Sequence, residues 1–134
     1  KISLKLRYGR IRAEPIKSIG GSMREIKFRV WDSCEGSPDG MVYGSLYSLL
    51  TLYPDIDKYW MQYTGLNDKN GVEIYEGDIL RLTSSAPHVD VIVTWDDEHA
   101  GFTTNKNGHT HMFGSHLAEV IGNIYENPEL LEEV

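Results

Sequence analysis

The stretch WMQYTGLNDKNGVEIYEGDILRL, from Trp60 to Leu82, decides the fold of this chain. It places two turns, marked by Gly71 and Gly77, between three short apolar runs. The chain must therefore reverse its direction twice within one short stretch. Such a pattern is typical of antiparallel β-structure.

The first turn, residues 67–71 with the sequence NDKNG, collects residues that tolerate a positive φ or hydrogen-bond their own backbone. We expect residues 61–64 to pair with residues 72–75 across it. The second turn is tighter and contains Gly77 and Asp78. We expect Glu76 and Asp78 to be exposed at this corner, with Asp78 accepting local backbone N–H bonds, so that Gly71, Gly77 and Asp78 are structural turn residues.

Further strands are predicted on both sides of this stretch by the alternation of apolar and polar residues. They cover residues 26–31, 41–43, 89–95, 102–104, 110–113 and 120–125, and Gly122 suggests a bulge or a close backbone approach. Residues 46–52 favour a short helix, and Asn127-Pro128-Glu129 resembles a helix start. The predicted fold is mainly β, a small antiparallel SH3-like barrel with extra hairpins and one or two short helices.

The length of 134 residues predicts a single domain with a core of its own. We place this domain at residues 23–134, with an N-terminal strand and loop region at 23–60 and a barrel-like core at 61–134. Cys34 is the only cysteine, which favours a reducing interior, and no apolar run reaches the ~20 residues of a membrane helix. The expected location is the cytoplasm of a bacterial cell.

The net charge of −7 is distributed unevenly. Residues 1–22 carry six Lys and Arg against one Glu, whereas residues 23–134 carry seven against nineteen Asp and Glu. An acidic body repels a phosphate backbone, so duplex nucleic acid is a poor partner. The basic leader, residues 1–22, has two interpretations: an edge strand with one basic face, or a non-native extension before a native start at Met23. The second is favoured.

Catalytic and metal-binding patterns are weak. His109 and His111 would share one strand face, but no cysteine or carboxylate triad joins them, and we predict no metal and no cofactor. The run from Asp96 to His99 places carboxylates beside an imidazole, although a solvated turn explains it better. With no nucleophile or phosphate-binding motif, no catalytic residue is predicted.

Aromatic residues are more numerous than a small core needs. Large rigid side chains supply much of the energy of protein interfaces. Single-stranded nucleic acid also stacks on aromatic rings, but its binding sites are basic. The candidate interface residues are therefore assigned to a protein partner or to self-association: Trp60, Tyr59, Tyr63, Tyr75 and Trp95.

Three blocks of the sequence resemble the YopX family, small proteins encoded by phages and prophages of bacteria. They are residues 23–32 (MREIKFRVWD), residues 61–79 (MQYTGLNDKNGVEIYEGDI) and residues 119–130 (EVIGNIYENPEL). The resemblance implies a mostly β protein that contains a barrel and for which self-association is one expectation. It supplies no catalytic residues.

Together these features predict a phage or prophage accessory protein that binds an unknown host or phage protein without catalysis, and that forms a homo-oligomer. The alternative is a nucleic-acid-associated barrel, which would either bind single strands or mimic DNA through its carboxylates.

Overall fold

The computed structural model describes residues 25–32, 40–54, 59–84, 86–106, 108–111 and 114–133, without the side chains of residues 109–111 and 132–133. The basic leader lies outside these residues, as does Cys34. The strands of the described part are β1 (Phe28–Trp31), β2 (Met41–Tyr43), β3 (Trp60–Asn67), β4 (Glu73–Tyr75), β5 (Asp78–Leu82), β6 (Val89–Asp96), β7 (Gly101–Lys106), β8 (His109–His111) and β9 (Ala118–Asn123). The helical elements are α2 (Leu46–Leu52) and the 3-10 turns η1 (Ser115–Leu117) and η2 (Pro128–Glu133).

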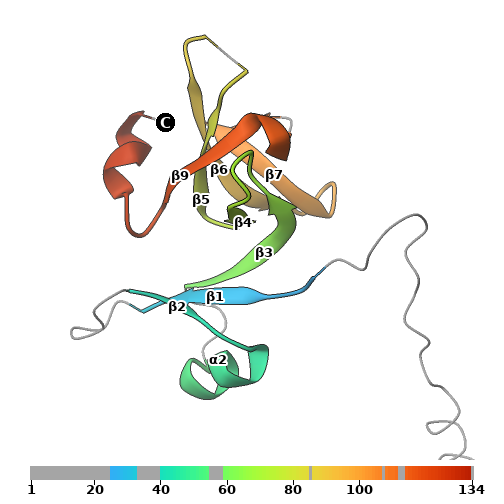
Figure 1. Cartoon of the computed structure of the whole chain (residues 1–134), viewed down its shortest axis with the longest axis vertical. Helices are drawn as coiled ribbons and strands as arrows, with labels where there is room; N and C mark the ends of the chain where they lie inside the picture. Colours follow the sequence, from blue (N-terminus) through green and yellow to red (C-terminus); the bar gives the residue numbers. More distant parts are fainter. Residues whose placement is uncertain are drawn as a thin grey trace, which may run out of the picture.

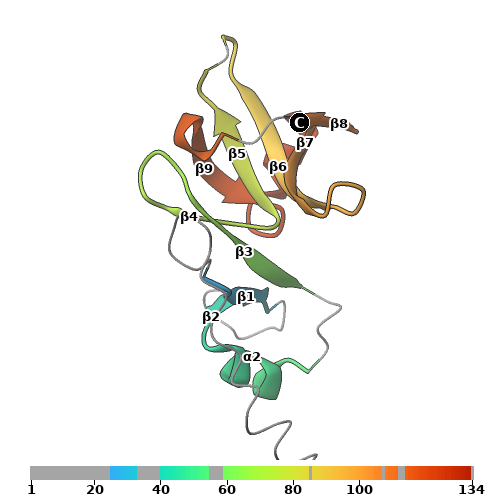
Figure 2. The ribbon, with the colours of Figure 1, turned by 90° about the vertical axis from the view of Figure 1, so that its right-hand side faces the viewer.

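The strands form two antiparallel sheets. The order is β2-β1-β3-β4 in the four-stranded sheet and β8-β7-β6-β5-β9 in the five-stranded sheet. The five-stranded sheet curls into a half-barrel, and β3 runs from it toward β1 and β2 (Figures 1 and 2). The mainly β, antiparallel fold expected from the sequence is confirmed.

The hairpin predicted around Gly71 is present as β3 and β4. Tyr63 faces Tyr75 and Asn67 faces Glu73 in the ladder. Three residues separate the partners on β3 but only one on β4, so β3 bulges between them. Bulges increase the local twist of a strand, and here β3 turns from one sheet toward the other.

The carboxylate of Asp68 joins the β3–β4 turn to β9. One oxygen accepts hydrogen bonds from the backbone N–H groups of Asn70 (2.8 Å) and Val72 (2.9 Å), and the other accepts one from Val120 (2.9 Å). Burial by itself would raise the pKa of Asp68, but these three N–H donors hold it below its ordinary value. Asp68 therefore stabilises its own turn and also links this turn to β9 by a hydrogen bond.

The main core lies inside the curled sheet and is made of small and branched apolar side chains. Its fully buried members are Ile74, Leu80, Val91, Val93 and Ala118. A second cluster, Met61, Tyr63 and Tyr75, packs where the two sheets meet, with Trp31, Met41 and Tyr125 against it. Met61 and Tyr63 lie two residues apart on β3, as do Val91 and Val93 on β6, so each pair faces one side of its strand, whereas the neighbours Ile74 and Tyr75 on β4 enter different clusters.

The bulge predicted at Gly122 is confirmed. Ile79 pairs with Gly122 and the next residue, Leu80, pairs with Val120, so one β9 residue is left over. A Cβ atom on Gly122 would overlap the side chain of Asn127. Asn127 accepts a hydrogen bond from the Asn123 N–H (3.2 Å), so the chain after β9 folds back tightly over the glycine.

Several element predictions differ from the structure in form or in bounds. β1 begins at Phe28 and not at residue 26, and β9 spans Ala118–Asn123 and not residues 120–125. The segment after Asn127 is a 3-10 helix, η2, and β8 begins at His109, one residue before the predicted strand. Residues 112–113, which the prediction included in that strand, lie outside the described residues.

Helix α2 is short and begins at Ser45, whose side chain accepts a hydrogen bond from the Ser48 N–H (3.2 Å). It lies beside β1 and β2, at the end of the molecule away from the five-stranded sheet (Figures 1 and 2). Among the described residues, no helix has the length and apolar character needed to cross a membrane.

Candidate functional site

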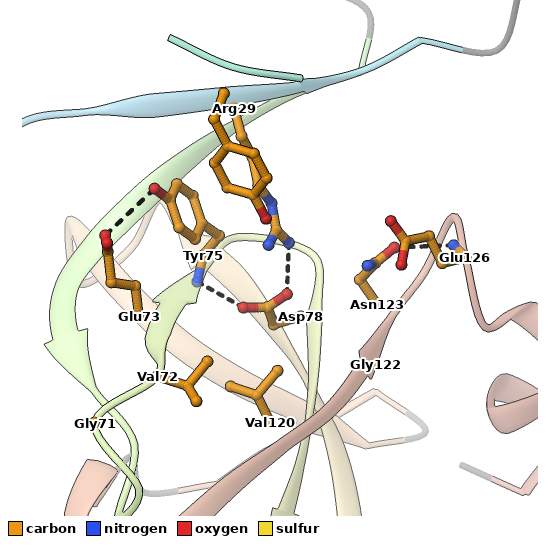
Figure 3. Close-up of a pocket in the computed structure, with 11 residues that line it drawn as sticks. Arg29, Gly71, Val72, Glu73, Tyr75, Asp78, Val120, Gly122, Asn123 and Glu126 are labelled. Atoms are coloured by element: carbon orange, nitrogen blue, oxygen red, sulfur yellow. Dashed lines mark hydrogen bonds and ion pairs between the residues drawn. The ribbon is translucent and has the colours of Figure 1, made fainter. Parts of the chain in front are cut away.

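A polar pocket of about 450 Å³ lies between the two sheets (Figure 3). Residues from β1, the β3–β4 turn, β4, β5 and β9 line it, so it is built from segments distant in sequence. The side chains that can carry charge here are Arg29, Glu73, Asp78 and Glu126.

Arg29 and Asp78 form the buried ion pair of this pocket. The Arg29 Nη2 donates to Asp78 Oδ1 at 2.5 Å, and the two side chains are 6 % and 1 % exposed. The second Asp78 oxygen accepts the Tyr75 N–H (2.8 Å), and the guanidinium lies 4.4 Å from the centre of the Tyr75 ring. Burial raises the pKa of Asp78, while Arg29 and the Tyr75 N–H partly offset that rise.

This burial corrects the expectation for Asp78. The sequence suggested an exposed corner residue, because polar side chains at tight turns usually face water. Here Arg29 arrives from β1 and covers the corner, so the carboxylate has a partner that its own hairpin does not supply. The local N–H bond expected for Asp78 is present.

A second charged group borders the polar pocket. Lys27 lies 2.5 Å from Glu73 and 4.7 Å from the centre of the Tyr63 ring. Burial, followed by the negative charge of Glu73, raises the pKa of Tyr75 to about 12. Three of the four charged lining residues, Arg29, Glu73 and Asp78, are thus paired within the chain. The Arg29–Asp78 pair joins β1 of one sheet to β5 of the other.

An aromatic pocket of about 340 Å³ lies around the start of β3. We define it by four rings, Tyr59, Trp60, Trp95 and Tyr125, together with the carboxylate of Glu76. Its remaining lining is small or aliphatic. Of the residues that the structure describes, none with a basic side chain lines it.

The backbone and polar groups of the aromatic pocket are unusual. Tyr59 has a φ of +64°, a conformation that costs a bulky residue on the order of 1 kcal/mol. The indole Nε1 of Trp60 is buried and has no hydrogen-bond partner among the described residues. Backbone strain is often found at functional sites, and a buried donor without a partner calls for an explanation, as it does for the Arg29 Nε in the polar pocket.

Glu76 is the ionisable group of the aromatic pocket at neutral pH. It is half-buried, and burial raises its pKa. Its charge also contributes to the raised pKa of Tyr125, after burial and the influence of Tyr59. A hydrogen bond with the Gln62 backbone offsets part of the rise in the pKa of Glu76, and a nearby cation would stabilise the charged carboxylate further.

A third feature is the apolar surface of α2. Leu49 is its buried residue, whereas Tyr47 is 82 % and Leu52 66 % exposed. The helix has no charged residue. We define the α2 surface as Tyr43, Leu46, Tyr47, Leu50 and Leu52, all of them exposed.

The five candidate interface residues separate into two groups. Tyr59, Trp60 and Trp95 line the aromatic pocket, and Trp95 is 45 % exposed. Tyr63 and Tyr75 lie in the core with exposures of 7 % and 4 %, and their rings pack 5.5 Å apart. Tyr63 on β3 and Tyr75 on β4 are thus both buried within the second core cluster.

The charged run from Asp96 to His99 forms an exposed turn. Asp96 accepts the backbone N–H groups of Glu98 and His99 and lies 2.7 Å from the His99 Nδ1. The hydrogen bond from His99 lowers the pKa of Asp96. Within the described part of the chain, no three His, Cys, Asp or Glu side chains lie close enough together to hold a metal ion. The side chains of His109 and His111 lie outside that part.

Sequence reasoning missed two features. The role of Glu76 was hidden because its pocket is assembled from β3, β6 and the segment after β9. The α2 surface could have been found from the helix sequence LYSLLTL, in which five of the seven residues are apolar or aromatic and none is charged.

The structure resembles the crystal structure of protein EF1440 from Enterococcus faecalis, with a TM-score of 0.51 and 27% sequence identity over 81% of this chain and 99% of that one. No curated protein matches the sequence. The profile of the YopX protein family matches residues 42–132, which is more than half of the chain. The chain therefore belongs to the YopX family.

Proposed function

We propose that this chain is a non-enzymatic protein-binding module of phage or prophage origin, acting in the bacterial cytoplasm as a homo-oligomer. The observation that carries the proposal is the α2 surface, because five large apolar side chains of β2 and α2 are exposed, and three of them, Leu46, Tyr47 and Leu50, are neighbours at spacings i+3 and i+4 on the helix. Contiguous exposed apolar surface marks interaction sites on soluble proteins.

A second copy is the occupant that fits this surface. The chain has a net charge of −7, so most of its faces repel another copy, but α2 has no charged residue. Two neutral apolar helices can pack against each other across a two-fold axis without any complementary charge. Burial of Tyr47 and Leu52 would then contribute about 1.5–3 kcal/mol per side chain.

Sedimentation velocity over a range of micromolar concentrations tests the proposal. The parent should sediment with twice the mass of the chain or more, and Tyr47→Ser/Leu52→Ser should sediment as a monomer. Leu117→Ser is the matched control, since Leu117 is an exposed leucine on η1. A parent that stays monomeric, or a control variant that dissociates equally, would overturn self-association through α2.

The nucleic-acid alternative can be tested on the same purified protein with a band-shift experiment. A band shift with single-stranded DNA that decreases with salt, and that persists without residues 1–22, would favour the nucleic-acid alternative over protein binding.

A further inference from the structure

The aromatic pocket combines three features that the α2 surface lacks. It is concave, it is lined by four aromatic rings, and it contains one carboxylate, Glu76. Its volume of about 340 Å³ suits one side chain or a small ligand. The pocket therefore selects for a particular chemical group, whereas the α2 surface selects only for apolar area.

Aromatic rings and a carboxylate attract the same kind of ligand. The faces of Trp and Tyr rings attract cations, and sites built from several such rings recognise ammonium groups. Glu76 adds a negative charge, and no basic side chain of the described residues lines the pocket to neutralise it. Binding an anion here would bring it next to Glu76 on a chain of net charge −7.

We propose that the aromatic pocket binds the ammonium group of a lysine side chain, methylated or unmodified, presented by a partner protein. The lysine stem would lie among the apolar lining residues, Met61, Ile92 and Val93, while its charge lies near Glu76 and the rings. This inference deepens the proposed protein-binding function, but it uses a different surface from α2.

The surroundings of Glu76 are consistent with a site prepared for a cation. Burial raises the pKa of Glu76 and a hydrogen bond with the Gln62 backbone offsets part of that rise, so the carboxylate is partly desolvated and gains from a positive partner. Trp60 has a buried, unpartnered Nε1, and Tyr59 is held in a strained backbone conformation. The Tyr59 and Tyr125 rings pack edge to face with their centroids 5.7 Å apart, and this contact holds both rings in place without a ligand, which lowers the entropic cost of binding.

The test is an NMR titration of the full chain that follows the indole N–H signals of Trp60 and Trp95. The probes are Nα-acetyl-lysine methylamide, its Nε-trimethyl derivative, and the uncharged isostere Nα-acetyl-norleucine methylamide. The two lysine probes should shift both indole signals in a saturable manner, and the norleucine probe should shift neither. Equal shifts with all three probes would mean simple apolar contact and would overturn the inference.

Two variants locate the charge and the ring that are responsible. Glu76→Gln and Trp95→Leu should each weaken binding of the lysine probes about five- to tenfold, as expected for loss of an ion pair or a cation–π contact. Glu129→Gln, an exposed glutamate on η2, removes the same charge outside the pocket and should leave binding unchanged. Retained binding in Glu76→Gln would contradict the role of the carboxylate.

A further titration with choline distinguishes a lysine of a protein partner from a free quaternary amine as the ligand. Saturable binding of choline together with no binding of either lysine probe would assign the pocket to a free quaternary amine and overturn the lysine inference. Self-association through α2 is measured separately by sedimentation, so a monomeric chain that binds the lysine probes would refute only the oligomer.

Discussion

Arg29 on β1 and Asp78 on β5 lie 49 residues apart in sequence and form a buried ion pair between the two sheets. The Arg29 guanidinium also packs over the Tyr75 ring of β4. One arginine thus contacts three strands where the sheets meet. Because both charges are removed from water, each depends on the other for compensation.

Breaking this pair on one side should destabilise the fold strongly. Arg29→Leu leaves Asp78 buried without its cation, and the free energy of unfolding should fall by about 3–5 kcal/mol. The double variant Arg29→Leu/Asp78→Asn should lose less than Arg29→Leu alone, because an amide can still accept the Tyr75 N–H. Urea denaturation measures these two variants and Asp78→Asn alone. Losses in the two single variants that simply add in the double variant would contradict the coupling.

Asp68 should contribute stability that depends on pH. Asp68→Asn removes a charged acceptor of three backbone N–H groups, and at pH 7 it should cost about 1.5–3 kcal/mol in urea denaturation. The pKa of Asp68 is lower in the folded chain than in the unfolded one, so this stability is present above the ordinary pKa and is lost as the pH falls through the folded value. The difference between parent and variant should therefore shrink below pH 4.

The control for Asp68 is Asp97→Asn, an exposed aspartate in the β6–β7 turn. It should change stability by no more than about 0.5 kcal/mol at any pH. A difference between parent and Asp68→Asn that stays constant from pH 7 to pH 3 would refute the assigned hydrogen bonds.

Substitutions at Gly71 test the β3–β4 turn, from which the fold was predicted. The φ of Gly71 is +82°, and a Cβ atom there would meet no other atom within 4 Å. Gly71→Ala should therefore cost only the backbone penalty of a left-handed residue, about 1–2 kcal/mol. Gly71→Asn should cost less, since asparagine tolerates this conformation. Thermal unfolding ranks the two variants, and the opposite order would show that φ is not the deciding factor.

The charge of Glu76 should lower the free energy of unfolding at neutral pH, because the carboxylate is half-buried in the aromatic pocket. Its pKa is raised in the folded chain, so the folded state binds its proton more tightly and stability falls as the pH rises through the folded pKa. Glu76→Gln should thus be slightly more stable than the parent at pH 7, with the gain disappearing below the ordinary pKa near 4.5. Calorimetry at pH 4 and pH 7 measures this, with Glu129→Gln as the unchanged control.

The sequence predicted the strands and turns where the signal was local. The NDKNG turn, the alternation in β6 and the glycine at the β9 bulge each depend on a few neighbouring residues, and all three have counterparts in the structure. The 3-10 form of η2 was not predicted. Helix-start signals describe the first turn alone and do not determine which hydrogen-bond spacing follows.

The site was less accessible to sequence reasoning than the fold. Aromatic abundance indicated an interface, but it could not separate Tyr63 and Tyr75, which lie in the core, from Trp95, which stays on the surface. Tyr63 and Trp95 both occur in strands of eight residues that are rich in apolar side chains. Their different exposure depends on which face of each strand meets another layer, and that is decided by sheet packing.

By itself, the amino-acid sequence determined the family, the antiparallel β-structure and the acidic character of residues 23–134, because turn residues, alternation and charge are properties of neighbouring residues or of simple counts. Only the tertiary structure decided that Arg29 would cover Asp78, and that Glu76 would lie among the rings of β3, β6 and the segment after β9. These groups are distant in the chain, and the contact of two distant side chains depends on how the bulged strand β3 leads one sheet onto the other.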